Sequence, residues 1–164
     1  MIERAYVGIG SNIRPERHVP QALALLRAEF RDIEASSVYE CPPLGFDGEA
    51  FHNLVVSFET DLGIEPLIST LRTIESACGR RRGASGSPSR TLDLDLLLYG
   101  EVESAGDGIE LPRGDVLSYA FVLAPLAEIA PTLKHPVAQR TFAELWSEFE
   151  ETHEMRRIAD AVPG

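Results

Sequence analysis

The order of the apolar segments predicts an α+β fold of the ferredoxin-like type, with the element order β-α-β-β-α-β and a C-terminal extension. Three observations support this prediction. Short apolar runs typical of strands alternate with segments whose apolar residues recur every three or four positions, as in helices. Glycine and proline clusters separate these segments. The 164 residues, 44% of them hydrophobic, suffice for one core, so we expect a single domain over residues 1–164. In this fold an antiparallel sheet carries its helices on one face.

The first half of the arrangement contains three strand-like segments and one helix. Residues 4–9 predict a buried strand that ends in a turn at residues 10–12. A helix is expected to begin within residues 17–20, because proline is tolerated in the first turn but not deep inside a helix. Two further strands are predicted over residues 32–40 and 51–60. The apolar stripe of the helix consists of Val19, Leu23, Leu26 and Phe30.

The second half begins with a helix that Pro66 opens and Gly79 ends. Residues 79–89 lack apolar periodicity and predict a flexible loop, a candidate lid over a site. A strand over residues 92–98 follows it. The expected core residues of the helix are Leu67, Leu71, Ile74 and Cys78, and the expected C-terminal elements are a hairpin over 101–112, helical structure over 116–130 around Pro125, and a short amphipathic helix over 141–151 with Phe142, Leu145 and Phe149 on one side.

Composition limits the classes of partner. The formal net charge of −11 disfavours general binding to nucleic acid or to anionic membranes. No apolar run reaches the length of about 18 residues that a transmembrane helix needs, and the first residues do not resemble a signal peptide. The two cysteines, Cys41 and Cys78, are expected to be free thiols in a reducing compartment. We therefore expect a cytoplasmic monomer that acts on small molecules and binds neither nucleic acid nor membranes.

The segment Arg90–Tyr99, with the sequence RTLDLDLLLY, says most about function. Its leucines at 92, 94, 96 and 98 alternate with Asp93 and Asp95, so in a strand the leucines share one face and both aspartates lie on the other. The two aspartates are then roughly 7 Å apart at the backbone. Their carboxylates can converge on one or two hard cations, which prefer oxygen ligands. The alternative is a pair of exposed aspartates on an ordinary edge strand.

A group of arginines precedes this strand. Arg80, Arg81, Arg82 and Arg90 lie in a stretch without any acidic residue. A local positive patch in an acidic protein can select a small polyanion such as a nucleotide, and carboxylates for magnesium beside arginines for phosphate are what phosphoryl-type transfer requires. A solvated arginine-rich loop is the alternative explanation.

Several strings occur in order along the chain and together resemble the 6-hydroxymethyl-7,8-dihydropterin pyrophosphokinases of the folate pathway. The resemblance runs from about Ala5 to Pro131. It implies a transfer of the β,γ-diphosphate of ATP to the hydroxymethyl group of a dihydropterin, with release of AMP. The strongest strings are Gly8–Asn12, Tyr39–Gly45 with the sequence PPLG at its end, Phe51–Asn53 and Arg90–Asp95, and looser ones are Leu111–Pro112 and Phe121–Pro131.

The resemblance also implies roles for individual residues. Asp93 and Asp95 would hold two Mg²⁺ ions that bridge the nucleotide phosphates and the pterin hydroxyl. Arg80 and Arg90 would join them in catalysis. The implied ATP contacts include Glu75 and Arg82, with Arg80 and Arg82 closing over the phosphates together with the loop. The implied pterin contacts are Asn53 at the ring's polar edge, Phe121 and Phe51 at its faces, and the segment Cys41, Pro42, Pro43 and Leu44 at its rim.

The chain departs from the family pattern at several of these positions. Ser87–Pro88–Ser89 stands where the family usually has Trp-Gly-Pro, and Tyr119 stands where an ATP-binding arginine is usual. Arg113 replaces a histidine, and we expect it to bind ATP and to compensate in part for the missing charge, which a tyrosine cannot supply. Phe51 and Cys41 replace a tyrosine and a threonine.

These departures leave alternatives open. The chain is either a pyrophosphokinase with an altered ATP site, a relative that acts on a modified pterin in a methanopterin-type pathway, or a catalytically impaired paralogue that binds pterin or nucleotide. The intact aspartate pair and Arg90 favour an enzyme. An RNA-binding ferredoxin-like domain is disfavoured, because the charge is acidic and aspartates stand on the open sheet face.

Overall fold

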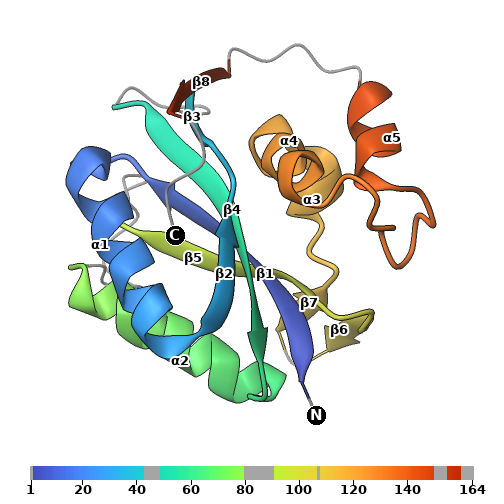
Figure 1. Cartoon of the computed structure of the whole chain (residues 1–164), viewed down its shortest axis with the longest axis horizontal. Coiled ribbons are helices and arrows are strands. Elements are labelled where there is room, and N and C mark those ends of the chain that lie inside the picture. The colour runs from blue at the N-terminus through green and yellow to red at the C-terminus, as the bar shows by residue number, and fades with distance from the viewer. Residues whose placement is uncertain (1, 43–48, 80–90, 107, 150–154, 160–164) are drawn as a thin grey trace.

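The computed structural model describes residues 2–42, 49–79, 91–106, 108–149 and 155–159. Its centre is a six-stranded antiparallel sheet with the strand order β5-β1-β4-β3-β8, and β2 also pairs with β4 (Figure 1). This confirms the predicted α+β ferredoxin-like fold. The strands are β1 (Glu3–Ser11), β2 (Arg31–Ala35), β3 (Val38–Cys41), β4 (Phe51–Thr60), β5 (Asp93–Tyr99) and β8 (Arg156–Ala159).

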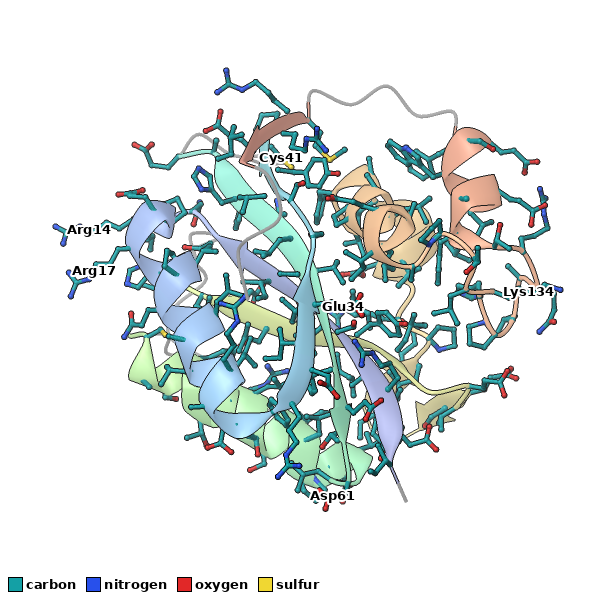
Figure 2. All side chains as sticks on the ribbon, viewed as in Figure 1. Arg14, Arg17, Glu34, Cys41, Asp61 and Lys134 are labelled. Carbon is teal, nitrogen blue, oxygen red and sulfur yellow. The ribbon has the colours of Figure 1, made fainter. Side chains whose placement is uncertain are left out.

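Two helices cover one face of the sheet, as predicted. They are α1 (Pro15–Glu29) and α2 (Ile64–Ala77), and they lie side by side in Figure 1. The predicted stripes of both helices are buried against alternate residues of the strands. Phe30 stacks on Phe58 with a centroid distance of 4.0 Å. On the outer side of α1, Arg14 and Arg17 extend into the solvent (Figure 2). These apolar contacts hold the two helices against the sheet.

The C-terminal extension packs on the opposite face of the sheet. In β4, Val55 belongs to a second apolar cluster, whereas its neighbours Leu54 and Val56 belong to the first, as alternation requires. Part of the face that we expected to be open is therefore covered, and a cavity remains on it near Asp93 and Asp95 at the start of β5. The covering helices are α3 (Asp115–Ser118), α4 (Ala120–Ile129) and α5 (Phe142–Ser147), and the predicted hairpin is present as β6 (Ser104–Gly106) and β7 (Ile109–Leu111).

Several element boundaries differ from the predictions. β1 continues to Ser11, into the turn expected at residues 10–12. α1 begins at Pro15, where a missing N–H has no cost, so that Pro20 lies inside the helix. The strand expected over 32–40 is two strands, because Ser36 pairs with Val55 through both its backbone N–H and its side-chain oxygen. Similarly, Tyr119 adopts an extended conformation and divides the expected helix over 116–130.

Two predictions near the chain's end also need correction. The helix expected over 141–151 ends at Ser147, and its start is fixed by a capping box between Thr141 and Glu144. Strand β8 was not predicted, because the described side chains at 156–158 are exposed and show no alternation; it forms through backbone pairing with β3. In the described part of the chain, none of the helices has the length and apolar character to cross a membrane.

Candidate active site

The site begins with two glycines in the middle of the sheet. Gly8 pairs with Asp95 on one side, and Gly10 pairs with Asp93 on one side and with Asn53 on the other. Asp93, Gly10 and Asn53 thus form one row across three neighbouring strands. Because neighbouring strands lie about 4.8 Å apart, the outer two residues of the row are about 10 Å apart at the backbone. Glycine in the middle leaves the space between them open.

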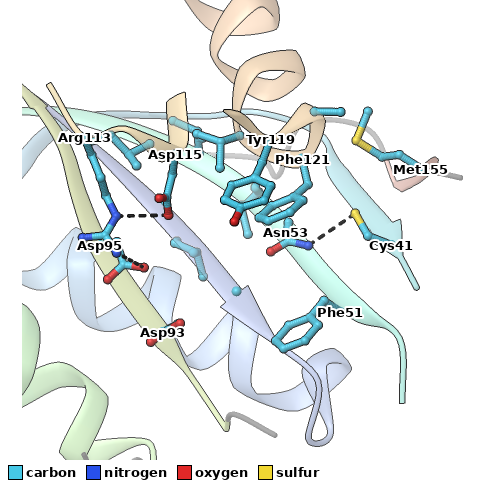
Figure 3. A pocket seen from close by; sticks show the side chains of 18 of the residues that line it. Cys41, Phe51, Asn53, Asp93, Asp95, Arg113, Asp115, Tyr119, Phe121 and Met155 are labelled. Atoms are coloured by element: carbon cyan, nitrogen blue, oxygen red, sulfur yellow. Dashed lines mark hydrogen bonds and ion pairs between the residues drawn. The ribbon is translucent and has the colours of Figure 1, made fainter. Parts of the chain in front are cut away.

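A bulge in β5 closes one end of this space. The register between β1 and β5 shifts between Tyr6 and Val7, so Leu97 is an extra residue on β5. The side chain of Leu97 lies over Gly8, with its nearest atom 3.5 Å from where a Cβ would be. The shift also moves Leu98 to the sheet face that carries α3, α4 and α5. Our prediction that Leu98 shares a face with Leu92, Leu94 and Leu96 is therefore wrong. The result is a cavity of about 630 Å³ above the glycines (Figure 3).

One end of the cavity is charged. Asp93 and Asp95 line it together with Arg113 and Asp115 (Figure 3). Arg113 Nη2 lies 4.0 Å from Asp95 Oδ2, and Arg113 Nε donates a hydrogen bond of 3.1 Å to Asp115 Oδ2. Burial opposes the charge of Arg113, but the carboxylates of Asp95, Asp115 and Asp93 outweigh this effect and raise the pKa of the guanidinium above its ordinary value. Arg113 is therefore a fixed positive charge beside the aspartate pair.

The other end of the cavity is aromatic. Tyr119 and Phe121 stack with a centroid distance of 5.0 Å and an interplanar angle of 20°, and Phe51 stands apart from them on β4 (Figure 3). Between these walls, Asn53 Nδ2 donates a hydrogen bond of 3.3 Å to Cys41 Sγ. This leaves the Asn53 carbonyl oxygen on the side of Gly10, 3.0 Å from where a Cβ would lie. A flat ring between the aromatic walls would meet a polar edge at Asn53.

The Cys41 thiol is part of this end. It is buried, and desolvation raises its pKa to about 11, although the hydrogen bond from Asn53 opposes the shift. The thiol is therefore neutral near pH 7 and acts as a small polar group rather than as a nucleophile.

The start of β5 is held in place by Ser11 on β1. Ser11 is fully buried, and its hydroxyl donates a hydrogen bond of 2.6 Å to the carbonyl oxygen of Thr91. This contact fixes the chain two residues before Asp93. Ser11, which belongs to the Gly8–Asn12 string, therefore stabilises the backbone just before the aspartate pair.

Most of the predicted site residues that the structure describes line this one cavity. Glu75 is not among the residues that line the cavity. Its side chain is 1% exposed and lies between α2 and β5, where its carboxylate accepts a hydrogen bond from the backbone amide of Leu94. The structure therefore does not support the expected direct contact with ATP. Pro43, Leu44, Arg80, Arg82 and Arg90, and the proposed lid except for Gly79, lie outside the described residues. The predicted residues brought together are Cys41, Pro42, Phe51, Asn53, Asp93, Asp95, Arg113 and Phe121.

Among the lining residues that sequence reasoning missed, Asp115 and Met155 contribute a charge and a flexible side chain. Asp115 pairs with Arg113, and its spacing of two residues from an arginine in a turn could have indicated this pair. Met155 lines the cavity from the segment before β8, and no pattern in the sequence points to it.

The charged end offers a partial ligand set for a hard cation. Among the residues that the structure describes, no group of three or more His, Cys, Asp and Glu side chains is close enough to hold a metal ion. Two carboxylates suit a divalent ion that takes its other oxygen ligands from water and from a phosphate-bearing substrate, as Mg²⁺ usually does.

The chain is similar in sequence to proteins of one family. Residues 6–131 match the family model described as 7,8-dihydro-6-hydroxymethylpterin-pyrophosphokinase (HPPK). The 2-amino-4-hydroxy-6-hydroxymethyldihydropteridine pyrophosphokinase of Pseudomonas aeruginosa is 39% identical over 140 residues, which cover 83% of this chain and 86% of that protein. The protein of the same name from Bacillus subtilis is 38% identical over 129 residues, covering 76% and 77%.

Solved structures support the fold. The Plasmodium falciparum HPPK-DHPS wild type with STZ-DHP superposes with a TM-score of 0.74 at 13% identity. The match covers 90% of this chain but only 43% of that longer one. The likeness therefore concerns the fold of one part of the Plasmodium protein.

Proposed function

Because the chain belongs to the 7,8-dihydro-6-hydroxymethylpterin-pyrophosphokinase family, we propose that it transfers diphosphate from ATP to the hydroxymethyl group of a dihydropterin and releases AMP, as a step of folate biosynthesis. The observation that carries the proposal to individual residues is the row Asp93–Gly10–Asn53. In this row Asn53 provides a polar group at the aromatic end of the cavity, and Asp93 belongs to the acidic end. Gly10 lies between them and has no side chain to block the space.

The aromatic end suits a pterin. Phe51 on one side and Phe121 with Tyr119 on the other can enclose a flat bicyclic ring, and Asn53 can pair with the donor and acceptor groups at its edge. Cys41 and Pro42 line the rim. A ring held there would direct a substituent on its far side across Gly10 toward Asp93. The reacting hydroxyl would thus be oriented before transfer, which lowers the entropic part of the barrier.

The acidic end suits the nucleotide phosphates. Asp93 and Asp95 would hold Mg²⁺, for which the family resemblance implies two ions, and bound Mg²⁺ would neutralise charge on the phosphates. Arg113 would exchange its contact with Asp95 for a phosphate oxygen, because its charge is fixed and its side chain is 38% exposed to the cavity. The resemblance assigns phosphate contacts also to Arg80, Arg82 and Arg90. We no longer assign one to Glu75.

The names of the curated relatives favour this function over a modified-pterin enzyme and over an impaired paralogue. Cys41 and Cys78 are free thiols, which supports the proposal of a cytoplasmic protein. We further propose that the chain is a single-domain monomer, which size-exclusion chromatography with light scattering would test.

The decisive experiment incubates the protein with Mg-ATP and 6-hydroxymethyl-7,8-dihydropterin and separates the nucleotide products. We expect AMP and no ADP, with loss of AMP formation in Asp93→Ala and in Asp95→Ala while circular dichroism shows the fold intact. A parallel reaction with a side-chain-methylated pterin tests the modified-pterin alternative. Absence of AMP with both pterins, in a protein that still binds them, would identify an impaired paralogue.

A further inference from the structure

Leu94 stands between the two aspartates, and its backbone faces away from the sheet. β5 is an edge strand of the described sheet, since it pairs only with β1. On an edge strand, alternate residues direct their N–H and C=O groups outward, where no strand receives them. Leu94 is such a residue. Its two neighbours, Asp93 and Asp95, pair with Gly10 and Gly8.

Two charged side chains of α2 take the place of the missing strand. The backbone N–H of Leu94 donates a hydrogen bond of 2.7 Å to Glu75 Oε2. Its carbonyl oxygen accepts a hydrogen bond of 2.8 Å from Arg72 Nη1. The same two side-chain atoms, Arg72 Nη1 and Glu75 Oε2, also pair with each other at 3.0 Å. We call this arrangement the Arg72–Glu75 clamp.

Satisfying the backbone groups of Leu94 with a buried carboxylate is energetically less favourable than leaving them to water. Glu75 is 1% exposed, and burial of a carboxylate is strongly unfavourable unless its partners offset the lost hydration. Many edge strands leave their outward groups to water. A buried charge directed at this one residue therefore points to a need for a fixed backbone at Leu94. The charge-assisted hydrogen bonds to both of its polar groups are shorter and stronger than water could provide.

We propose that Arg72 and Glu75 are positioning residues for the aspartate pair: by holding the backbone of Leu94 they fix the separation and direction of the carboxylates of Asp93 and Asp95. The proposal rests on the proposed function of these aspartates as Mg²⁺ ligands. β1 holds the two aspartates on one side of the strand, and the Arg72–Glu75 clamp holds the residue between them on the other. Neither clamp residue lines the cavity or is needed to touch a substrate.

The clamp predicts a selective effect on metal binding. Glu75→Ala removes the acceptor for Leu94 N–H, and Arg72→Ala removes the donor for its C=O. The affinity for Mn²⁺ in the presence of a non-hydrolysable ATP analogue, measured by electron paramagnetic resonance, should fall at least tenfold in each variant. The affinity for the dihydropterin alone should change less than twofold, because Phe51 and Asn53 lie on β4, and Tyr119 and Phe121 lie at the start of α4.

Two further variants separate positioning from general packing. Glu75→Gln keeps an oxygen acceptor of the same reach and should restore most of the Mn²⁺ affinity that Glu75→Ala loses. Thr73→Ala, on the exposed side of the same helix, is the matched control and should behave as the wild type. Since Arg72 is only partly buried, Arg72→Ala keeps the test available if Glu75→Ala fails to fold.

Hydrogen exchange provides a readout that does not depend on activity. The amide of Leu94 should exchange slowly in the wild type and at least tenfold faster in Glu75→Ala, with the amides of β1 unchanged. Folded Glu75→Ala and Arg72→Ala proteins that bind Mn²⁺ as the wild type does would overturn the proposal, as would an equal loss of metal and pterin binding. A wild type that forms no AMP and binds no Mn²⁺ would instead overturn the proposed function. The hydrogen bonds of the clamp would then still stand, but they would not serve to position metal ligands.

Discussion

Arg113 lies between the aspartate pair and the expected position of the phosphates, and its removal should act in opposite directions on metal and on nucleotide. Without ligands, Arg113 Nη2 is 4.0 Å from Asp95 Oδ2. Any cation that binds Asp95 has to compete with this charge. The Arg113→Ala variant should therefore bind Mn²⁺ more tightly than the wild type when nucleotide is absent.

The size of this gain follows from the distance. Two unit charges 4 Å apart interact with about 4 kcal/mol at an effective dielectric constant of about 20. Arg113 is 38% exposed and also pairs with Asp115, so solvent screening reduces the interaction to about 1 kcal/mol. This corresponds to about a fivefold tighter binding of Mn²⁺.

The nucleotide should respond in the opposite sense. A charge-assisted hydrogen bond to a phosphate contributes about 1.5–3 kcal/mol, so Arg113→Ala should weaken ATP binding about ten- to a hundredfold. Mn²⁺ affinity without nucleotide is measured by electron paramagnetic resonance and ATP affinity by calorimetry in Mg²⁺. Arg140→Ala, which removes the same charge from an exposed pair with Glu148, is the matched control. The reasoning is refuted if both affinities move in the same direction, or if Arg140→Ala has the same effects.

Three other predictions follow from single contacts. Gly10→Ala should weaken dihydropterin binding about tenfold in a titration, because the new Cβ would meet Asn53 Oδ1 at 3.0 Å and disturb about one hydrogen bond; unchanged affinity would remove Asn53 from the pterin site. Iodoacetamide should label Cys41 slowly at pH 8 and about a hundredfold faster at pH 10, since burial raises its pKa to about 11, and saturating dihydropterin should prevent the labelling. His135 Nδ1 accepts hydrogen bonds from the N–H groups of Val137 and Ala138, and burial lowers its pKa. Its contribution to stability is therefore present above about pH 6.5 and lost as the pH falls below that value, so in urea unfolding the wild type should lose more stability between pH 7 and 5 than His135→Ala.

The sequence predicted the half of the fold that packs on α1 and α2. There, apolar periodicity and burial coincide: Leu67, Leu71 and Ile74 of α2 are buried as predicted, and so are alternate residues of β1 and β4. Periodicity carries this information because each element has one buried side. The same principle explains why β8 was missed, since its described side chains are exposed and it joins the sheet through backbone pairing with β3 and an ion pair between Arg156 and Glu40.

The error at Leu98 has a different cause. Strict alternation in β5 assigns Leu98 to the same face of the sheet as Leu94. The bulge at Leu97 adds one residue to the strand, so the side chain of Leu98 lies on the opposite face. The bulge depends on the partner strand, because the extra side chain occupies the space that Gly8 leaves open. Such a dependence between residues nearly ninety positions apart is not visible in the pattern of either strand alone.

The contacts of Glu75 in the structure could not be predicted from the sequence. The resemblance implied that Glu75 contacts ATP; in the structure its carboxylate accepts hydrogen bonds from the backbone amide of Leu94, 19 residues away, and from Arg72. Backbone groups are the same at every residue, so no side-chain pattern could reveal this partner. The edge position of β5 reveals it, because an edge strand leaves alternate backbone groups unpaired. In the structure β5 is the edge strand next to β1.

The same sheet geometry explains why the strings that identify the family are short and far apart. Gly8–Asn12, Phe51–Asn53 and Arg90–Asp95 lie on three strands that are neighbours in the sheet but distant in the chain. Each contributes one residue to the row Asp93–Gly10–Asn53. Along a strand, only every second residue faces the cavity, so each string can contribute only a few residues before it leaves the site. A substrate that reaches from Asn53 to Asp93 would have to cross all three strands, so one binding site would draw on all three strings although the chain keeps them far apart.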